Sequence, residues 1–331
     1  MKTAHGACIL ARTTRVKGQD GPSTRATFAW RRARQPPSSC ALVPYLQIHA
    51  AVVLWGFTAI LGKAIQLPAL PLVWWRMLLV SVCLALWPPV WRELRRMRPR
   101  LVLSYAGIGV ILGLHWLTFY TAIKWSNASV GATCIATGPV FLAFVEPWIR
   151  RRGFASRELW IGLLGIAGVA LVVDGAPSGM GPGIAIGILS ALIVTFFGVF
   201  NKQLIDAASA VTVLFIEITA GTLFLSLFIP FSATWPWPET ADLGMLFALS
   251  FGCTLVPMQL SLRALRHLST FSVQLSVNLE PVYAVVLGAL LFGEHLTLGF
   301  EFYLGVLVLL AAVLGDIPRR AVQSAKAVPV N

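Results

Sequence analysis

The sequence has few charged residues and is especially poor in acidic ones. Only 12% of its 331 residues are charged, whereas 57% are hydrophobic. A soluble globular domain usually carries about 25% charged residues. Together with a mean hydropathy of +0.78, this composition excludes an ordinary soluble domain and predicts an all-α polytopic membrane protein.

Motifs of the common enzyme and pump classes are also missing. The chain has no Walker A sequence, no GxSxG, no HExxH and no GxGxxG after a strand, so ATP-driven pumping and common hydrolase chemistry have no sequence basis. The cysteines show no CxxC spacing, and the histidines are not at ligand spacing. We therefore expect no disulfide framework, no metal site, no cofactor and no enzymatic activity. The five cysteines are Cys8, Cys40, Cys83, Cys134 and Cys253.

Basic residues outnumber acidic ones by 26 to 13. They lie in short breaks between apolar runs and not along one helix, so the excess indicates membrane topology and no nucleic-acid partner. Residues 1–44 form a separate basic zone mixed with Ser, Thr and Pro, which we expect to be disordered. A transit peptide, a cytosolic tail and an over-extended start are the alternatives for this zone.

From Tyr45 onward, apolar runs close to the roughly 20 residues that cross a bilayer alternate with short polar breaks. Arginines are concentrated in the second and fourth breaks and after the last run, and the odd-numbered breaks hold almost none apart from Lys124. The positive-inside rule then assigns both termini to the cytosol. We predict ten membrane helices, at residues 46–66, 69–90, 101–120, 127–148, 158–174, 183–202, 209–230, 242–262, 268–292 and 296–315.

The two halves of the chain show a weak internal repeat. Aligning residues 122–141 with 264–283 without a gap pairs Pro139 with Pro281. Because each half holds five predicted helices, an odd number, the second half must enter the membrane in the opposite orientation. This is the inverted-repeat plan of secondary transporters, in which the substrate site lies near the membrane midplane.

Several short sequence features follow one another along the chain: Trp55-Gly56, Arg76, Pro139, Glu280-Pro281 and Gly293-Glu294. In this order they resemble the EamA-type transporters of the drug/metabolite transporter superfamily. The resemblance covers residues 46–315 and departs at Arg150–Gly153, where family members often keep Gly-Glu. It implies a first repeat at residues 45–175, a second, inverted repeat at 176–316 and a cytosolic tail at 317–331.

The resemblance implies a secondary transporter of the inner membrane that moves a small organic metabolite by alternating access. Export of amino acids or related compounds is the activity it implies most often, coupled to protons or a counter-substrate. A nucleotide-sugar or sugar-phosphate exchanger is the nearest alternative, but it would need several cations in the cavity, and Arg76 is the only arginine at membrane depth. A non-transporting scaffold or membrane enzyme is another alternative, and a homodimer stays open.

Two polar stripes run along the ninth predicted helix. Gln274 and Asn278 share one face with Thr270, and Glu280 lies on another face about 160° away. We expect Gln274 and Asn278 to line a substrate cavity, because amides orient polar groups without imposing a charge. A carboxylate at membrane depth costs roughly 2.5 to 3.5 kcal/mol, so Glu280 is either an ion-coupling site or a hydrogen-bonded structural residue.

Arg76 in the second helix and Glu217 in the seventh lie at matching places in the two halves and are candidates for a charge pair or for ion coupling. Arg76 cannot lose its charge. It either snorkels to the outer interface beside Trp74 and Trp75 or faces the cavity, where it would favour a carboxylate or phosphate. Glu217 cannot reach an interface in this way, so its carboxylate needs a partner inside the protein.

By resemblance, further candidate cavity residues lie at mid-depth, where ordinary helix packing is the alternative for each aromatic ring. His115 is interpreted either as a proton-coupling group or as a hydrogen-bonded histidine. The candidates are Trp55, His115, Trp116, Phe197, Gln259 and Tyr283.

Overall fold

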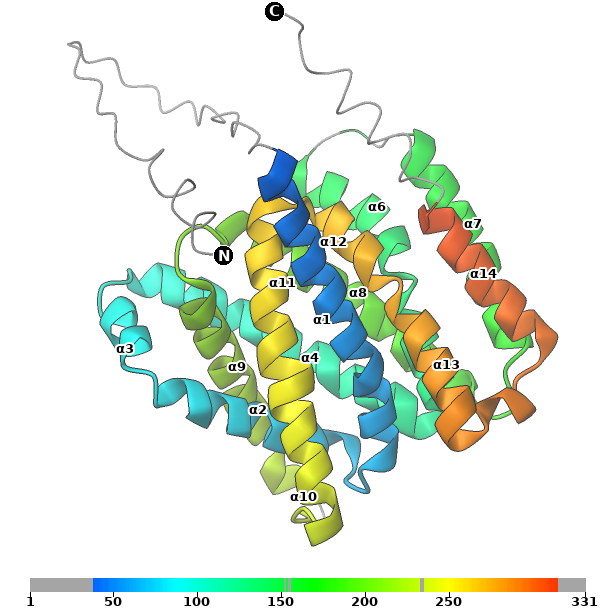
Figure 1. The fold of residues 1–331 in the computed structure, drawn as a ribbon, viewed down its shortest axis with the longest axis horizontal. Helices are drawn as coiled ribbons and strands as arrows, with labels where there is room; N and C mark the ends of the chain where they lie inside the picture. The colour runs from blue at the N-terminus through cyan, green and yellow to red at the C-terminus, as the bar shows by residue number, and fades with distance from the viewer. Residues whose placement is uncertain (1–37, 152, 154–155, 233–234, 315–331) are drawn as a thin grey trace, which may run out of the picture. The chain divides into compact units, whose positions relative to one another are not determined.

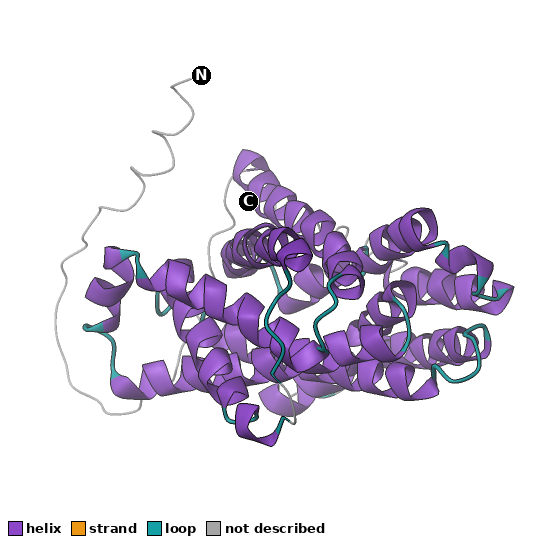
Figure 2. Ribbon diagram, turned by 90° about the horizontal axis from the view of Figure 1, so that it is seen from below, coloured by secondary structure: helices purple, strands orange, loops and turns teal. Residues whose placement is uncertain are grey.

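The structure is a computed structural model that describes residues 38–151, 153, 156–232 and 235–314. The expected tails up to residue 37 and from residue 315 lie outside these residues. The described part is all-helical and contains no strand (Figure 2). Its first helix begins at Ser38, inside the segment that we assigned to the N-terminal tail.

The helices follow one another along the chain and are labelled in Figure 1. In order they are α1 (Ser38–Ala64), α2 (Ala69–Ala85), α3 (Pro88–Leu94), α4 (Pro99–Trp125), α5 (Ala128–Ile135), α6 (Gly138–Arg150), α7 (Ser156–Asp174), α8 (Gly181–Leu204), α9 (Ala210–Ser226), the 3₁₀ turn η2 (Ile229–Phe231), α10 (Thr240–Phe247), the π-helix η3 (Ala248–Leu255), α11 (Val256–His267), α12 (Thr270–Val277), α13 (Glu280–Phe292), the 3₁₀ turn η4 (Glu294–Leu296) and α14 (Phe300–Leu314).

Six helical segments in the described residues are long and apolar enough to cross a membrane, or seven if α2 and α3 form one bent span. The all-helical membrane class is therefore confirmed. The three other expected spans correspond to the shorter apolar helices Leu164–Asp174, Glu280–Phe292 and Phe300–Ala311. The six segments are Leu42–Ala64, Pro99–Trp125, Ala128–Arg150, Gly181–Leu204, Ala210–Phe231 and Thr240–His267.

The second helix ends earlier than expected. α2 stops at Ala85, and α3 leaves it at an angle of 85°. The reason is local: Trp87 is extended, with ψ 102°, and precedes Pro88, and a residue before proline avoids the α conformation. The expected single helix over residues 69–90 is therefore wrong at its C-terminal end.

Two helices that we expected to be continuous are broken near their centres, between α5 and α6 and between α12 and α13. In each case a proline, Pro139 or Pro281, stands near the start of the second segment. Proline has no N–H to donate to the preceding turn, which favours a helix start at this point. The two breaks contact each other, because Asn278 Nδ2 donates to the carbonyl of Ala136 at 3.1 Å.

Small residues let α4 cross α9 closely. Gly109 and Gly113 on α4 face Gly221 and the backbone of Glu217 on α9. A Cβ placed at Gly109 would lie only 2.1 Å from the carbonyl oxygen of Glu217. This is the small-residue spacing that allows membrane helices to approach one another. α4 also packs on α8, and α7 lies beside α14 (Figure 1).

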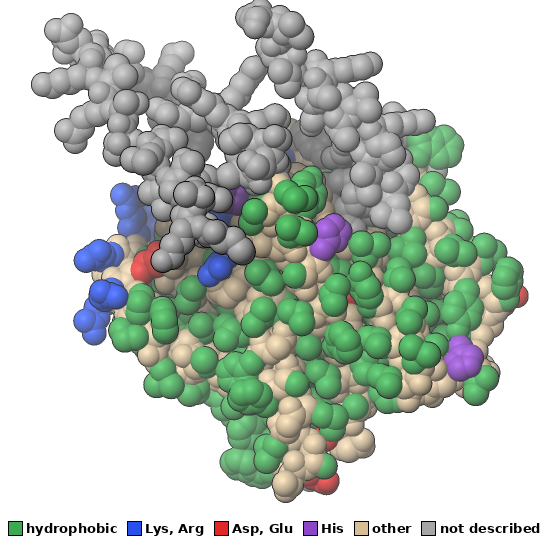
Figure 3. Space-filling model, in the orientation of Figure 1, with side chains coloured by type: hydrophobic (Ala, Val, Ile, Leu, Met, Phe, Trp, Pro, Cys, Tyr) green, Lys and Arg blue, Asp and Glu red, His purple; other side chains and the backbone are tan. Residues whose placement is uncertain are grey.

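Lysines at corresponding places in the two halves hold helix ends together. Lys63 donates to the carbonyl of Ser126, just after α4, and Lys202 donates to the carbonyl of Leu265 in α11. In both cases 63 residues separate the donor from the acceptor. Figure 3 shows hydrophobic side chains over most of the face in view, with Lys and Arg gathered at one side, as expected for a surface that contacts lipid.

Candidate functional site

A cavity lies between helices from both halves of the chain: α1, α2, α4, α5, α8, α11, α12 and α13. It holds about 890 Å³ of space not filled by atoms, its open part included. Most of its lining is apolar or aromatic, as is usual for binding sites of small organic molecules. The polar lining residues are Thr58, Arg76, His115, Ser261, Thr270, Gln274 and Glu280.

Arg76 is fully buried at one wall of this cavity. Its Nε donates to Thr254 Oγ1 at 2.7 Å, and its Nη1 donates to Tyr120 OH at 2.6 Å. The guanidinium carbon lies 3.8 Å from the centroid of the Trp116 ring, a cation–π contact. The interpretation that Arg76 snorkels to the outer interface is therefore wrong: neutral polar groups and an aromatic face hold its charge inside the protein.

Glu280 lines the same cavity as the first residue of α13. Only 7% of its surface is exposed. Within the described residues its carboxylate makes no hydrogen bond or ion pair, and the one ion pair found there joins Arg150 to Glu146. A carboxylate at the start of a helix is favoured by the helix dipole. The corresponding residue at the start of α6 is Gly138, so only the second half contributes an acid here.

Among the described residues, four buried polar atoms of the lining have no hydrogen-bond partner: Thr58 Oγ1, Arg76 Nη2, Thr270 Oγ1 and Gln274 Nε2. An unpaired buried donor or acceptor costs about 1–3 kcal/mol, and more when it is charged. These atoms belong to three helices that line one cavity, α1, α2 and α12. Polar groups without a partner in the protein, beside an apolar and aromatic lining, are consistent with a binding site for a small molecule that carries polar groups.

His115 faces the cavity and is also hydrogen-bonded. Its Nδ1 lies 2.9 Å from Ser190 Oγ and 3.1 Å from the carbonyl of Ser190. Its ring is stacked on Phe119, with centroids 6.0 Å apart. The contacts with α8 fix the orientation of the imidazole ring.

The structure brings seven of the predicted site residues into one cavity lining and leaves four outside it. Those in the lining are Trp55, Arg76, His115, Trp116, Phe197, Gln274 and Glu280. Asn278, Gln259, Tyr283 and Glu217 do not belong to it.

The break before α13 explains why Asn278 lies outside the cavity lining and Glu280 lies in it. The expected faces assumed one continuous helix, but the chain turns at Asn278 and Leu279. Asn278 is 1% exposed and bonds to the α5–α6 break. Glu280, which we assigned to the face opposite Gln274, enters the cavity with it.

The other three residues serve in helix contacts. Gln259 donates to the carbonyl of Ala210 at 3.1 Å. Tyr283 is 39% exposed and packs against Gly56, where an added Cβ would lie 2.6 Å from Tyr283 Cβ. Glu217 is fully buried and accepts a hydrogen bond from Asn201 at 2.8 Å, so its partner is an amide and not Arg76.

Several residues of the site were not predicted. Thr58 follows Trp55 by three positions on α1, and this helical spacing would have found it. Tyr120, which bonds Arg76, lies one turn after Trp116 on α4 and carries a similar signal. The sequence gives no such spacing signal for Thr254, because its position depends on a π-helical turn that the sequence pattern does not reveal.

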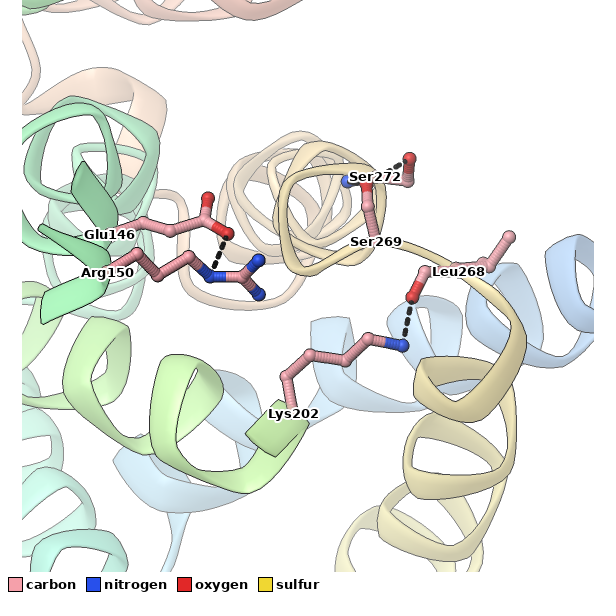
Figure 4. A network of polar contacts seen from close by, with 6 residues as sticks. All are labelled: Glu146, Arg150, Lys202, Leu268, Ser269 and Ser272. Atoms are coloured by element: carbon pink, nitrogen blue, oxygen red, sulfur yellow. Dashed lines mark hydrogen bonds and ion pairs between the residues drawn. The ribbon is translucent and has the colours of Figure 1, made fainter. Parts of the chain in front are cut away.

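Polar contacts join the ends of several helices next to the cavity. Near lining residue Thr270, the ends of α6, α8, α11 and α12 meet (Figure 4). There Lys202 donates to the carbonyl of Leu268 at 2.8 Å, and Ser269 Oγ accepts from Ser272 N at 3.0 Å (Figure 4).

At the N-terminus of α5, Glu294 accepts from the backbone N–H groups of Ala128 at 3.0 Å and Ser129 at 2.9 Å. Glu294 therefore caps the N-terminus of α5.

In the described residues no group of three or more His, Cys, Asp or Glu side chains could hold a metal ion. The site is a pocket between membrane helices, with one cation, one carboxylate and unpaired polar atoms. Its class is that of an integral membrane protein with a binding cavity for a small molecule.

Comparison with known proteins gives the family. The model of the EamA-like transporter family matches residues 42–174 and 181–315. The chain belongs to this family and carries two of its repeats, which confirms the resemblance. The uncharacterized transporter PA0485 of Pseudomonas aeruginosa is 27% identical over 260 residues, covering 74% of this chain and 84% of that protein. A solved crystal structure with 15% identity superposes with a TM-score of 0.59 over 87% of this chain and 100% of its own; this likeness concerns the fold.

Proposed function

We propose that the protein is a secondary transporter of the inner membrane that exports amino acids or related small metabolites by alternating access through the cavity around Arg76 and Glu280. The main observation behind this proposal is that the cavity is lined from both repeats and that, among the described residues, it combines buried polar atoms without a partner with a guanidinium and a carboxylate that form no ion pair. Protons or a counter-substrate supply the energy.

The proposal includes ten membrane crossings in two inverted five-helix repeats, residues 45–175 and 176–316, with both termini in the cytosol. Two kinds of evidence support it. The helix breaks before Pro139 and Pro281 occur in both repeats, and the lysine contacts from Lys63 and Lys202 span the same number of residues. Broken helices that meet at the midplane are typical of transporters with inverted repeats. In this topology α3 lies outside the membrane at the cytosolic surface.

The charges of the lining favour this substrate class over a sugar nucleotide. Among the described residues of the lining, Arg76 is the only arginine, Glu280 is the only acid, and there is no lysine. One cation and one carboxylate match a zwitterion, whereas a pyrophosphate group would need several cations and would be repelled by Glu280. The aromatic rings of Trp55 and Phe197 favour an apolar remainder of the substrate.

The test is transport by the purified protein in proteoliposomes, with a panel of labelled metabolites centred on amino acids and run with and without a pH gradient. Glu280→Gln keeps the size of the side chain and removes its charge. Glu301→Gln, an exposed glutamate on α14, is the matched control. We expect selective flux of one compound class, lost in Glu280→Gln and kept in Glu301→Gln.

Two results would count against the proposal in different ways. If flux survives in Glu280→Gln, the carboxylate has a structural role only. If the wild-type protein moves no compound of the panel in either direction, a transporter of amino acids or related metabolites is refuted. Protease protection of tags at both ends tests the cytosolic termini, and digestion of either tag from outside would overturn the topology.

A further inference from the structure

The eighth apolar segment contains a feature that the transport proposal does not use. This segment, Thr240–His267, is not a uniform α-helix, because residues Ala248–Leu255 form a π-helix. The N–H of Val256 donates to the carbonyl of Phe251, five residues back. Pro257 follows directly and has no N–H to donate to the preceding turn. Short π-helical stretches inside α-helices occur frequently at functional sites.

The π-helix brings one hydroxyl group to Arg76. Thr254 Oγ1 donates to the carbonyl of Leu249, again five residues back, at 2.7 Å. With its hydrogen used in this bond, the hydroxyl oxygen accepts from Arg76 Nε at 2.7 Å. A π turn holds one residue more than an α turn, which rotates the side chains that follow it. The direction of Thr254 therefore depends on the π-helix.

The guanidinium of Arg76 is held from three directions. Thr254 binds Nε, Tyr120 binds Nη1 at 2.6 Å, and the ring of Trp116 covers one face at 3.8 Å. A planar guanidinium fixed at two nitrogens and one face cannot turn. Among the described residues, Nη2 is the one guanidinium nitrogen of Arg76 for which no hydrogen-bond partner is found. None of the three holding groups is an anion, so the positive charge itself is not compensated by them.

We infer that the π-helix is a specificity device, in which Thr254 orients Arg76 so that Nη2 binds a carboxylate group of the substrate. This rests on the proposed transport function and adds a positioning residue and a substrate group to it. A carboxylate carries one negative charge, which a single guanidinium edge matches. A phosphate dianion would meet the charge of Glu280 in the same cavity. Thr254 itself is not part of the cavity lining, so it acts through Arg76.

The test compares carboxylates with matched neutral carboxamides in proteoliposomes, using labelled amino acids and the corresponding amino acid amides. Thr254→Val keeps the shape of the side chain and removes the acceptor. Thr254→Ser restores the acceptor. Thr222→Val is the control, because Thr222 is also buried and bonds only to its own helix, at the carbonyl of Ile218.

We expect the wild-type protein to have a lower KM for at least one carboxylate than for its amide. Thr254→Val should raise the KM for the carboxylate by at least about tenfold, the value of a hydrogen bond to a charged group, with the KM for the amide unchanged. Thr254→Ser and Thr222→Val should behave as the wild-type protein. If Thr254→Val does not fold, Tyr120→Phe removes the second contact of Arg76 and should shift the same ratio.

The outcomes separate this inference from the proposed function. Flux with equal KM values for carboxylates and amides, or a Thr254→Val effect that is the same on both, overturns the positioning role and leaves transport intact. A preference for phosphorylated compounds overturns the carboxylate assignment. Absence of flux for every compound in the wild-type protein refutes the transport proposal itself.

Discussion

The crossing of α4 and α9 gives a prediction that depends on a single methyl group. In Gly109→Ala the new Cβ would lie 2.1 Å from the carbonyl oxygen and 2.6 Å from the Cα of Glu217. Ordinary van der Waals contact begins at 3.4 Å, so the gap must widen by about 1.3 Å. Both opposing atoms belong to the backbone and cannot rotate away. The two helices must therefore separate.

The cost of this separation follows from the packing around it. Forcing one extra methyl group into a well-packed interior costs typically about 1–3 kcal/mol. Gly113 and Gly221, one turn further along the crossing, would lose their contact as well. We expect Gly109→Ala to lower the unfolding temperature of the purified protein in detergent, measured by tryptophan fluorescence. Transport should also weaken, because α4 carries His115 and Trp116 of the cavity.

The neighbouring residue Gly107 supplies the control. It lies on the same helix but is exposed, and nothing stands within 4 Å of a Cβ built there. Alanine is favoured over glycine in a helix by up to about 1 kcal/mol, so Gly107→Ala should unfold at the wild-type temperature or slightly above it. Equal unfolding temperatures for Gly107→Ala and Gly109→Ala would refute the close-contact argument.

Two further predictions concern the glutamates outside the cavity. Glu294→Gln leaves one side-chain oxygen to accept the bonds that two oxygens accept in the wild-type protein; amide hydrogen exchange at Ser129 should therefore become faster, and an unchanged rate would contradict the cap. Burial alone would raise the pKa of Glu93 on α3, but hydrogen bonds from Ser209 and Thr212 outweigh it and hold the pKa below the ordinary value of 4.5. A lowered folded-state pKa stabilises the protein above the ordinary pKa, and this contribution is lost as the pH falls through the lowered value. The unfolding temperature should drop at acid pH less in Glu93→Gln than in the wild-type protein, and equal drops would exclude a role for Glu93.

The lengths of the apolar runs predicted several membrane spans well. Where a predicted helix end was wrong, a proline in the chain was the reason. The expected helix at 209–230 agrees with the segment Ala210–Phe231, because a long apolar run in a membrane protein has no alternative to a helix. The expected helix at 69–90 is wrong at its end because Pro88 stops it. Prolines were noted in the sequence, but only the structure shows which of them change the direction of the chain.

The charged residues of the site could be predicted from the energetic cost of placing them in an apolar segment. The directions in which the side chains of the site point could not be predicted. Arg76 and Glu280 stood out because charged groups are expensive in an apolar segment, and both line the cavity. Their surroundings could not be predicted. The faces predicted for Asn278 and Glu280 assumed a continuous helix, but the helix is broken between them. The hydrogen bond between Arg76 and Thr254 depends on a π-helix in place of a regular α-helix. Both depend on backbone irregularities that periodicity cannot detect.

The two repeats share a backbone plan but divide the chemistry unequally. Both have a break before a proline, yet the second segment begins with Gly138 in one repeat and with Glu280 in the other. Arg76 lines the cavity, whereas Glu217, at the matching place, packs against Asn201 outside it. A cavity built in this way receives its cation from one repeat and its carboxylate from the other. In the transport mechanism that we propose, a zwitterion bound between them would contact both repeats at once, so that its binding and its release would each be linked to the movement of one repeat against the other.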